Sequence, residues 1–189
     1  MTNEERWFGY YLDELKTAGY VSMYKYQPEG IELCAETYIG DSNKPFKHFL
    51  RKEYTPDFHI HWTSKAIEMF IGKHKEFPFY TSAGLSIIDT KGAGFTFGKN
   101  NSDVTFPDRQ AWIWSKYNIF IQKVEVSLKH KSIFEKTFLP QRIREEEIYT
   151  TNGKTWTKGD SKIRFNAKTL AEYENWTQDV HEKRRSKHK

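Results

Sequence analysis

Two short segments of the chain carry acidic side chains beside apolar runs, and a lysine accompanies one of them. Asp57 lies within residues 54–58, and Asp89 stands two positions before Lys91 at the end of residues 85–91. Because side chains alternate along a strand, Asp89 and Lys91 share one face of their strand. Two carboxylates and an ammonium group on neighbouring strands can bind a divalent cation beside a phosphate.

Hydrolysis of a phosphodiester bond needs stabilised charge on the phosphoryl oxygens, an activated water and a positioned leaving group. Mg²⁺ bound to carboxylates supplies much of this. We expect Asp57 and Asp89 to bind the metal, together with the backbone carbonyl of Thr90. Lys91 would contact the attacking water or the scissile phosphate. The spacing alone fits equally a solvent-facing Asp57 and a surface ion pair between Asp89 and Lys91.

The first helix has to position a further acid. Residues 2–18 carry an apolar stripe at helical spacing, and Gly19 is a typical helix stop. Glu5 lies three residues before Phe8 on that stripe, so it can point into the domain and join the metal site. Thr2 and Glu5 also form a capping-box pattern, and this capping role is the alternative for Glu5.

The strands that follow place the two acids in a sheet. Residues 20–27 and 31–39 are rich in β-branched and aromatic residues, and the turn between them predicts a hairpin. A loop is predicted at residues 40–45. The strands that carry the acids are predicted at residues 54–62 and 84–91.

A helix and a strand complete the predicted core. A loop at residues 95–106 leads to a helix from Pro107 to Tyr117, because proline favours the first turn of a helix. Residues 118–127 alternate in polarity and form the last core strand. A strand, a helix and a strand in this order indicate a βαβ unit.

Beyond residue 128 the pattern changes to exposed charge runs. Residues 151–154, Thr-Asn-Gly-Lys, are a strong hairpin turn signal between short strands at 147–149 and 155–157. A final amphipathic helix begins at Asn166 or Thr169.

These patterns divide the chain into a core at residues 1–127 and a C-terminal extension at residues 128–189. The extension is predicted to contain a β-hairpin, a helix and a basic tail.

Charge and composition limit the partners and the location. The net charge is +5, and residues 181–189 hold five Lys or Arg against one Glu, which leaves the rest near +1. A basic tail fits a polyanionic partner and equally a solvated, disordered tail. One cysteine, Cys34, excludes a disulfide framework and a cysteine-based zinc site. No signal peptide and no apolar run of roughly 20 residues is present, so we expect a cytoplasmic protein without a membrane span.

Basic residues outside the acidic segments are candidate nucleic-acid contacts. A segment at residues 73–80 mixes lysines with aromatic residues, as nucleic-acid-binding segments do, although a plain surface loop fits equally well. The candidates in this segment and in the tail are Lys73, Lys75, Lys183, Arg184 and Arg185.

The joint order of these elements resembles the PD-(D/E)XK nuclease superfamily, which includes restriction endonucleases, Holliday-junction resolvases and lambda-type exonucleases. It is most similar to small phage and prophage proteins of that superfamily. The resemblance covers roughly residues 1–127. It rests on Glu5 in the first helix, on Tyr24-Lys25-Tyr26-Gln27-Pro28, on Tyr54-Thr55-Pro56-Asp57-Phe58 and on Ile88-Asp89-Thr90-Lys91-Gly92.

Two features depart from the pattern of the superfamily. Asp57 and Asp89 are 32 positions apart, so the intervening segment resembles an insertion. Asp89 stands where glutamate is more frequent.

The resemblance implies an α/β (α+β) fold with a restriction-endonuclease-like core, in which helices flank a mixed central β-sheet. It also implies DNA cleavage that depends on Mg²⁺ or Mn²⁺. By position, Asp57 and Asp89 would bind the metal, Lys91 would serve the water and the phosphate, and Glu5 would be the helix acid. The helix at 107–117 would add phosphate contacts through Arg109, Gln110 and Lys116.

We therefore expect a divalent-metal-dependent DNA endonuclease that is selective for DNA structure and acts on branched or duplex DNA. Phage recombination, repair, packaging or head maturation are the processes that the resemblance implies. The alternative is a non-catalytic nucleic-acid-binding or virion structural protein with a nuclease-like fold. Cleavage of RNA, a homodimer and a virion-associated location stay open.

Overall fold

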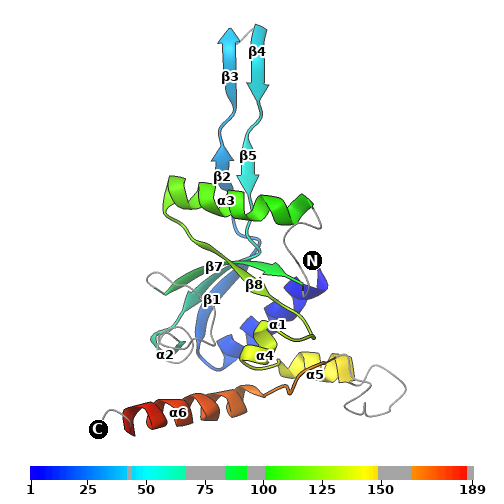
Figure 1. The fold of residues 1–189 in the computed structure, drawn as a ribbon, viewed down its shortest axis with the longest axis vertical. Helices are drawn as coiled ribbons and strands as arrows, with labels where there is room; N and C mark the ends of the chain where they lie inside the picture. The colour runs from blue at the N-terminus through cyan, green and yellow to red at the C-terminus, as the bar shows by residue number, and fades with distance from the viewer. Residues whose placement is uncertain (42–43, 67–83, 93–100, 149–162, 187–189) are drawn as a thin grey trace.

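The computed structural model describes residues 1–41, 44–66, 84–92, 101–148 and 163–186. Its centre is a four-stranded sheet with the order β1-β6-β7-β8 (Figure 1). β1 pairs antiparallel with β6, β6 pairs antiparallel with β7, and β7 pairs parallel with β8. The expected mixed central sheet flanked by helices is therefore confirmed. The strands are β1 (Val21–Tyr26), β6 (Phe58–Trp62), β7 (Leu85–Lys91) and β8 (Ile121–Glu125).

Helices cover both faces of this sheet. α1 (Asn3–Thr17) packs on one face, and α3 (Asn101–Tyr117) packs on the other as the crossover between β7 and β8. Neighbouring residues of β7 point to opposite faces of the sheet. Ile88 belongs to the core cluster that contains the α1 residues, and Ile87 packs against the cluster that contains Ile113 of α3. The predicted βαβ unit is confirmed by the parallel pairing of β7 with β8.

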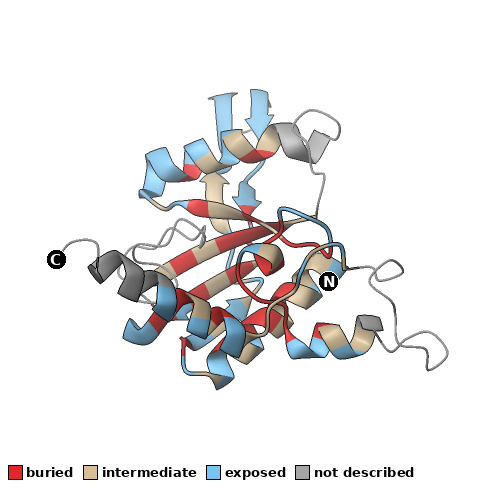
Figure 2. Ribbon diagram, turned by 60° about the horizontal axis from the view of Figure 1, so that its bottom comes forward, coloured by how far each residue is buried: buried red, intermediate tan, exposed pale blue. Residues whose placement is uncertain are grey.

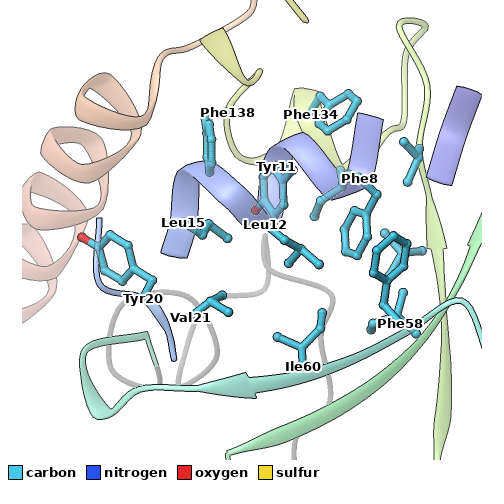
Figure 3. Close-up of a cluster of buried hydrophobic side chains, with 14 of the residues drawn as sticks. Phe8, Tyr11, Leu12, Leu15, Tyr20, Val21, Phe58, Ile60, Phe134 and Phe138 are labelled. Carbon is cyan, nitrogen blue, oxygen red and sulfur yellow. The ribbon is translucent and has the colours of Figure 1, made fainter. Parts of the chain in front are cut away.

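α1 forms as its sequence predicts. The Thr2 side chain accepts a hydrogen bond from the Glu5 backbone N–H at 3.2 Å, and the Glu5 side chain accepts one from Thr2 N at 2.9 Å. Gly19 follows the helix with φ of 79°, a conformation that glycine adopts readily. The apolar stripe of α1 faces the sheet, where Phe8 meets Phe58 edge-on at 5.1 Å between ring centroids (Figure 3).

The C-terminal segment packs against the other side of α1. The Tyr11 ring stacks on Phe138 at 4.6 Å, and the Tyr11 hydroxyl donates to Thr137 Oγ1 at 3.2 Å. Phe134 is fully buried in the same cluster (Figure 3), and so is Tyr173. Residues 128–148 and 163–186 therefore contribute to one core with the sheet. Its helices are α4 (Ile133–Lys136), α5 (Gln141–Ile148) and α6 (Leu170–Ser186), while the short α2 (Ser64–Ala66) follows β6.

A two-stranded ribbon, residues 31–54, projects from the body beyond α3, and we call it the arm (Figure 1). β2 pairs antiparallel with β5 at its base, and β3 pairs antiparallel with β4 at its far end. The arm stands clear of the body, and its outer strands are drawn as exposed in Figure 2. Its strands are β2 (Ile31–Cys34), β3 (Thr37–Asp41), β4 (Lys44–Phe49) and β5 (Lys52–Tyr54).

The arm corrects two sequence predictions. The hairpin between residues 20–27 and 31–39 is wrong, because β1 pairs with β6 and residues 31–41 pair with residues 44–54. Gln27, at φ of 44°, turns the chain out of the central sheet before the second segment can lie beside the first. The loop predicted at residues 40–45 is also largely wrong, since residues 40–41 and 44–45 belong to β3 and β4.

Two boundaries also differ from the prediction. α3 begins at Asn101, so residues 101–106 are helical and Pro107 lies inside the helix. Asparagine, serine and aspartate at positions 101–103 are residue types that favour a helix start, which explains the earlier boundary. Residues 147 and 148 end α5, so the predicted strand at 147–149 is wrong there, and the rest of that hairpin lies outside the described residues.

The final helix begins at the second of its two predicted starts, directly after Thr169. Thr169 Oγ1 accepts a hydrogen bond from Glu172 N at 3.2 Å, and the Glu172 side chain accepts one from Thr169 N at 2.6 Å. This capping box starts α6. Among the described helices, none is long and apolar enough to cross a membrane.

Candidate active site

Asp57 lies immediately before β6 and next to the end of β7. Its backbone N–H donates to the Ile88 carbonyl at 3.0 Å, and Phe58 is the register partner of Ile88. The long separation between Asp57 and Asp89 in the sequence therefore disappears in the sheet, where their strands are direct neighbours. This adjacency is the first requirement of the predicted site.

Thr90 fixes the carboxylate of Asp57. Asp57 Oδ2 accepts hydrogen bonds from Thr90 N at 2.6 Å and from Thr90 Oγ1 at 2.7 Å. In a strand, the N–H and C=O groups of one residue point toward the same neighbour, so the Thr90 carbonyl also points toward the Asp57 side. Burial raises the pKa of Asp57, and the nearby Asp89 charge adds to this, while Thr90 and Lys91 oppose it.

Asp89 is almost completely buried, with 5% of its surface exposed, on the face of β7 that meets α3. One carboxylate oxygen, Oδ1, forms an ion pair with Lys91, and the other, Oδ2, accepts a hydrogen bond from the Tyr54 hydroxyl. Burial, followed by the charge of Asp89, raises the pKa of Tyr54 far above its ordinary value. The Lys91 ammonium lies 5.7 Å from the Phe106 ring centre.

Glu5 is connected to the site only indirectly, through Tyr26. Its Oε2 accepts hydrogen bonds from the Thr2 backbone and, at 2.7 Å, from the Tyr26 hydroxyl. Burial and then the bond to Glu5 raise the pKa of Tyr26 to about 12, with a smaller effect from Asp57. Tyr26 therefore lies between the helix acid and the strand acid. In the described part of the chain, no three His, Cys, Asp or Glu side chains are close enough to hold one metal ion.

The helix residues predicted to contact phosphate have different roles in α3. Arg109 lies close enough to Tyr54 for its charge to oppose the rise in the pKa of that hydroxyl. Gln110 donates to the Ile121 carbonyl of β8. Lys116 binds Glu32 at the base of the arm at 3.2 Å. Of the three, Arg109 is the one that the structure brings to the site.

The remaining basic candidates lie elsewhere. Lys73 and Lys75 fall outside the described residues. Lys183, Arg184 and Arg185 belong to α6, on the opposite side of the molecule from the arm, and their side chains are outside the described part (Figure 1).

Several residues near the site carry no clear signal in the sequence. Glu4 packs against Gly92, since a Cβ at Gly92 would be 2.9 Å from Glu4 Oε1. A hollow of about 390 Å³ opens there, and Lys129 and Arg164 from the C-terminal segment line it. Tyr54 stands in the first acidic segment, so its position could have drawn attention. Lys129 and Arg164 could not be predicted from the sequence as neighbours of the site, because only the fold brings them to the same hollow as Gly92.

The site combines two acidic residues on paired strands, a lysine in contact with one acid, and an arginine nearby. In chemical terms, this set can hold a cation and orient a phosphate. No protein family, no curated protein and no solved structure matches the chain. Its function therefore has to be inferred from this geometry.

Proposed function

We propose that the protein is a divalent-metal-dependent nuclease that hydrolyses phosphodiester bonds in DNA, built on a core of the PD-(D/E)XK type. The observation that carries this proposal is the position of Asp57 beside Asp89, Thr90 and Lys91 on paired strands. The element order supports it, because a helix, three antiparallel strands, a crossover helix and a parallel strand agree with the core that the resemblance implies.

The donor set fits Mg²⁺ or Mn²⁺. Mg²⁺ is bound by one or two protein carboxylates and keeps water or phosphate oxygens as its other ligands, so three protein side chains are not required. Asp57 and Asp89 would supply the carboxylates, and Thr90 would supply its backbone carbonyl. When bound, such a metal stabilises charge on the phosphate and lowers the pKa of bound water.

The charges of the site favour a cation. The carboxyl group of Asp57 is partly buried and feels the charge of Asp89, and both effects raise its pKa. Partial burial and a neighbouring like charge both disfavour the ionised form of Asp57. A proton or a divalent cation relieves this cost, and at neutral pH a divalent cation is the more effective partner.

The other residues would orient the reacting groups. Thr90 fixes the direction of the Asp57 carboxylate, and Tyr54 fixes that of Asp89. The Lys91 ammonium would contact the attacking water or the scissile phosphate. Arg109 would bind a neighbouring phosphate, since a guanidinium group suits phosphate oxygens.

One observation favours a second candidate, a non-catalytic nucleic-acid-binding protein with the same fold. Both carboxylate oxygens of Asp89 already have partners, Lys91 and Tyr54. If the ion pair with Lys91 persists when the protein binds nucleic acid, the ammonium group already balances the charge of Asp89 and the site attracts a metal cation less strongly. The protein would then bind without cleavage.

Incubation with nucleic acids separates the two candidates. Supercoiled, single-stranded and four-way-junction DNA and one RNA are incubated with Mg²⁺ or with EDTA. We expect Mg²⁺-dependent cleavage of DNA, abolished in Asp57→Ala, Asp89→Ala and Lys91→Ala. Asp108→Ala, which changes an exposed acid on α3, serves as the matched control and should cleave normally. Full activity in Asp89→Ala contradicts the nuclease, and metal-independent binding without cleavage supports the second candidate.

A further inference from the structure

The arm exposes apolar surface on a ribbon that stands alone. In the described part of the chain, β3 and β4 pair only with each other. Isolated two-stranded hairpins are marginally stable in water, and gathered apolar side chains mark binding surfaces. The arm therefore has the properties of an element that a partner covers. Its exposed apolar side chains, with their exposed fractions, are Tyr38 at 44%, Ile39 at 51%, Phe46 at 90%, Phe49 at 43% and Leu50 at 66%.

The β4 edge of the arm is poorly suited to a protein strand as that partner. β4 contains Lys44, Pro45 and Lys47 within six residues. Lysine and proline on an edge strand oppose the addition of a further strand, and Pro45 offers no backbone N–H for a ladder. A second copy of the chain is therefore a poor occupant of this edge.

The charge of the returning strand favours a polyanion. Residues 44–52 contain Lys44, Lys47, Arg51 and Lys52 and no acidic residue. Lys47 lies over the Phe49 ring at 5.7 Å from its centre, so a cation and an aromatic ring are presented together. Basic side chains interleaved with aromatic rings are typical of nucleic-acid contacts.

The described acids of the arm are occupied by partners within the molecule. Glu36 binds His48 at 2.7 Å, and Glu53 binds Arg51. Glu32 binds Arg51 at 3.5 Å and also holds Lys116 of α3. These contacts hold the three glutamates inside the molecule, whereas Lys44 and Lys47 of β4 present their positive charges on the outer arm.

The dimensions of the arm match a DNA groove. A two-stranded ribbon fits the major groove of B-DNA. Residues 31–41 span about 35 Å at about 3.3 Å per residue, so the arm is long enough to follow the groove over several base pairs. The base of the arm lies at the candidate site, because Tyr54 ends β5 and donates to Asp89. DNA bound at the site would therefore continue along the arm.

We propose that the arm is a duplex-binding element that lies in the major groove of DNA. Lys44 and Lys47 contact backbone phosphates there, and Phe46 packs against the base edges. The inference rests on the proposed function and deepens it, because it identifies the substrate as duplex DNA that extends beyond the scissile bond along the arm.

Binding without cleavage tests this assignment. Fluorescence anisotropy in EDTA measures the affinity for a duplex of about 30 base pairs, roughly three helical turns, and for its single strand across a salt series. The arm variant carries Lys44→Ala, Phe46→Ala and Lys47→Ala. The matched control carries Lys16→Ala and Lys136→Ala, which remove two exposed lysines from α1 and α4.

The arm variant should bind the duplex at least about tenfold more weakly, with a salt slope reduced by about 2 for its two lysines. The control should bind within about twofold of the wild type, because single exposed lysines away from the contact add little. Dimethyl sulfate methylates guanine N7 in the major groove. The wild type should protect these positions, and the arm variant should lose that protection.

Three outcomes overturn the inference: equal duplex affinity in the arm variant, a loss restricted to the single strand, or a changed sedimentation coefficient with unchanged DNA affinity. The two proposals also fail separately. If the arm variant binds the duplex as the wild type does and Mg²⁺-dependent cleavage is observed, the arm has no role in binding, and the nuclease proposal stands. If the arm variant loses duplex affinity and the wild type cleaves no DNA, the arm does bind DNA, and the nuclease proposal is wrong.

Discussion

The carboxylate of Asp57 accepts both hydrogen-bond donors of Thr90, the backbone N–H at 2.6 Å and Oγ1 at 2.7 Å. One oxygen of Asp57 is thereby fixed to Thr90, the residue that lies between Asp89 and Lys91 in β7. Thr90 is buried, with 7% of its surface exposed, so water competes little for these bonds. The relative position of Asp57 and Asp89 is therefore built into the sheet.

Replacing Thr90 by valine removes the hydroxyl donor and keeps the shape of the side chain and the backbone bond. We expect the pKa of Asp57 to rise, because a hydrogen bond to its charged form is lost. The free energy of unfolding should fall by about 1 kcal/mol. Carboxyl titration by NMR and urea denaturation measure the two effects. Thr90→Ser retains the donor, and an unchanged Asp57 titration in Thr90→Val would contradict the contact.

Replacing Asp57 by asparagine should stabilise the metal-free protein at neutral pH. Burial and Asp89 raise the pKa of Asp57 in the folded state, so ionisation costs more when folded than when unfolded. The contribution of this group to stability is full below the unfolded pKa of about 3.9 and is lost as pH rises through the higher folded value. The advantage of asparagine should therefore be absent at strongly acidic pH and full at pH 7.

Thermal unfolding in EDTA across this pH range measures the difference, which we expect to reach a few degrees at pH 7. Asparagine retains an oxygen that accepts from Thr90, so the local geometry is preserved. Adding Mg²⁺ should raise the midpoint of the wild type and leave that of Asp57→Asn nearly unchanged, because binding to the folded state stabilises it. A Mg²⁺ shift of equal size in both proteins would place the metal elsewhere.

The Tyr54 hydroxyl fixes one oxygen of Asp89, and Tyr54→Phe removes this bond alone. We expect Mg²⁺-dependent cleavage to fall about tenfold, since a loosely held ligand lowers metal affinity by factors of this order. Higher Mg²⁺ concentrations should restore part of the rate. Tyr24→Phe, which removes a hydroxyl that donates to Asp13 of α1, is the matched control and should keep the wild-type metal dependence. A rate loss in Tyr54→Phe that no Mg²⁺ concentration relieves would argue for a different role.

Local patterns in the sequence predicted the helix of Glu5 and the strand of Asp89 and Lys91. The strand predicted at residues 54–62 is wrong at Asp57, because β5 ends at Tyr54 and β6 begins at Phe58. The capping box at Thr2 and the apolar stripe predicted α1, and the alternation of residues 85–91 placed Asp89 and Lys91 on one face. These features depend on neighbours a few residues apart, so a sequence shows them directly. The pairing of β6 with β7, on which the site depends, required the structure.

Features that depend on distant residues could not be predicted. The segment at 31–39 has a strand pattern that suits either neighbour. In the structure the chain turns at Gln27, and this segment pairs with residues within 44–54. Arg164 lies beside Gly92 through the fold of the C-terminal segment, and no spacing indicates it. Glu5 showed both of its possible roles in the sequence, and the structure shows it in the capping role.

Glu5 should act as a helix cap and as the partner of Tyr26 rather than as a metal ligand. Glu5→Gln can keep the capping box, because glutamine also accepts from the Thr2 backbone. We expect this variant to retain Mg²⁺-dependent cleavage within a few-fold of the wild type. Glu5→Ala should lower the free energy of unfolding by about 1 kcal/mol. Loss of cleavage in a stably folded Glu5→Gln protein would instead make Glu5 a ligand.

Phe138 joins the C-terminal segment to the core through its stacking on Tyr11. Because Phe138 is completely buried, Phe138→Ala should lower the free energy of unfolding by about 3–5 kcal/mol. Urea denaturation, followed by tryptophan fluorescence and by circular dichroism, should give one coincident transition, since the core is shared. Phe46→Ala, at a 90% exposed position of the arm, should change stability by less than about 0.5 kcal/mol. Two separated transitions in the wild type would show that residues 128–189 unfold independently of the sheet, contrary to the packing around α1.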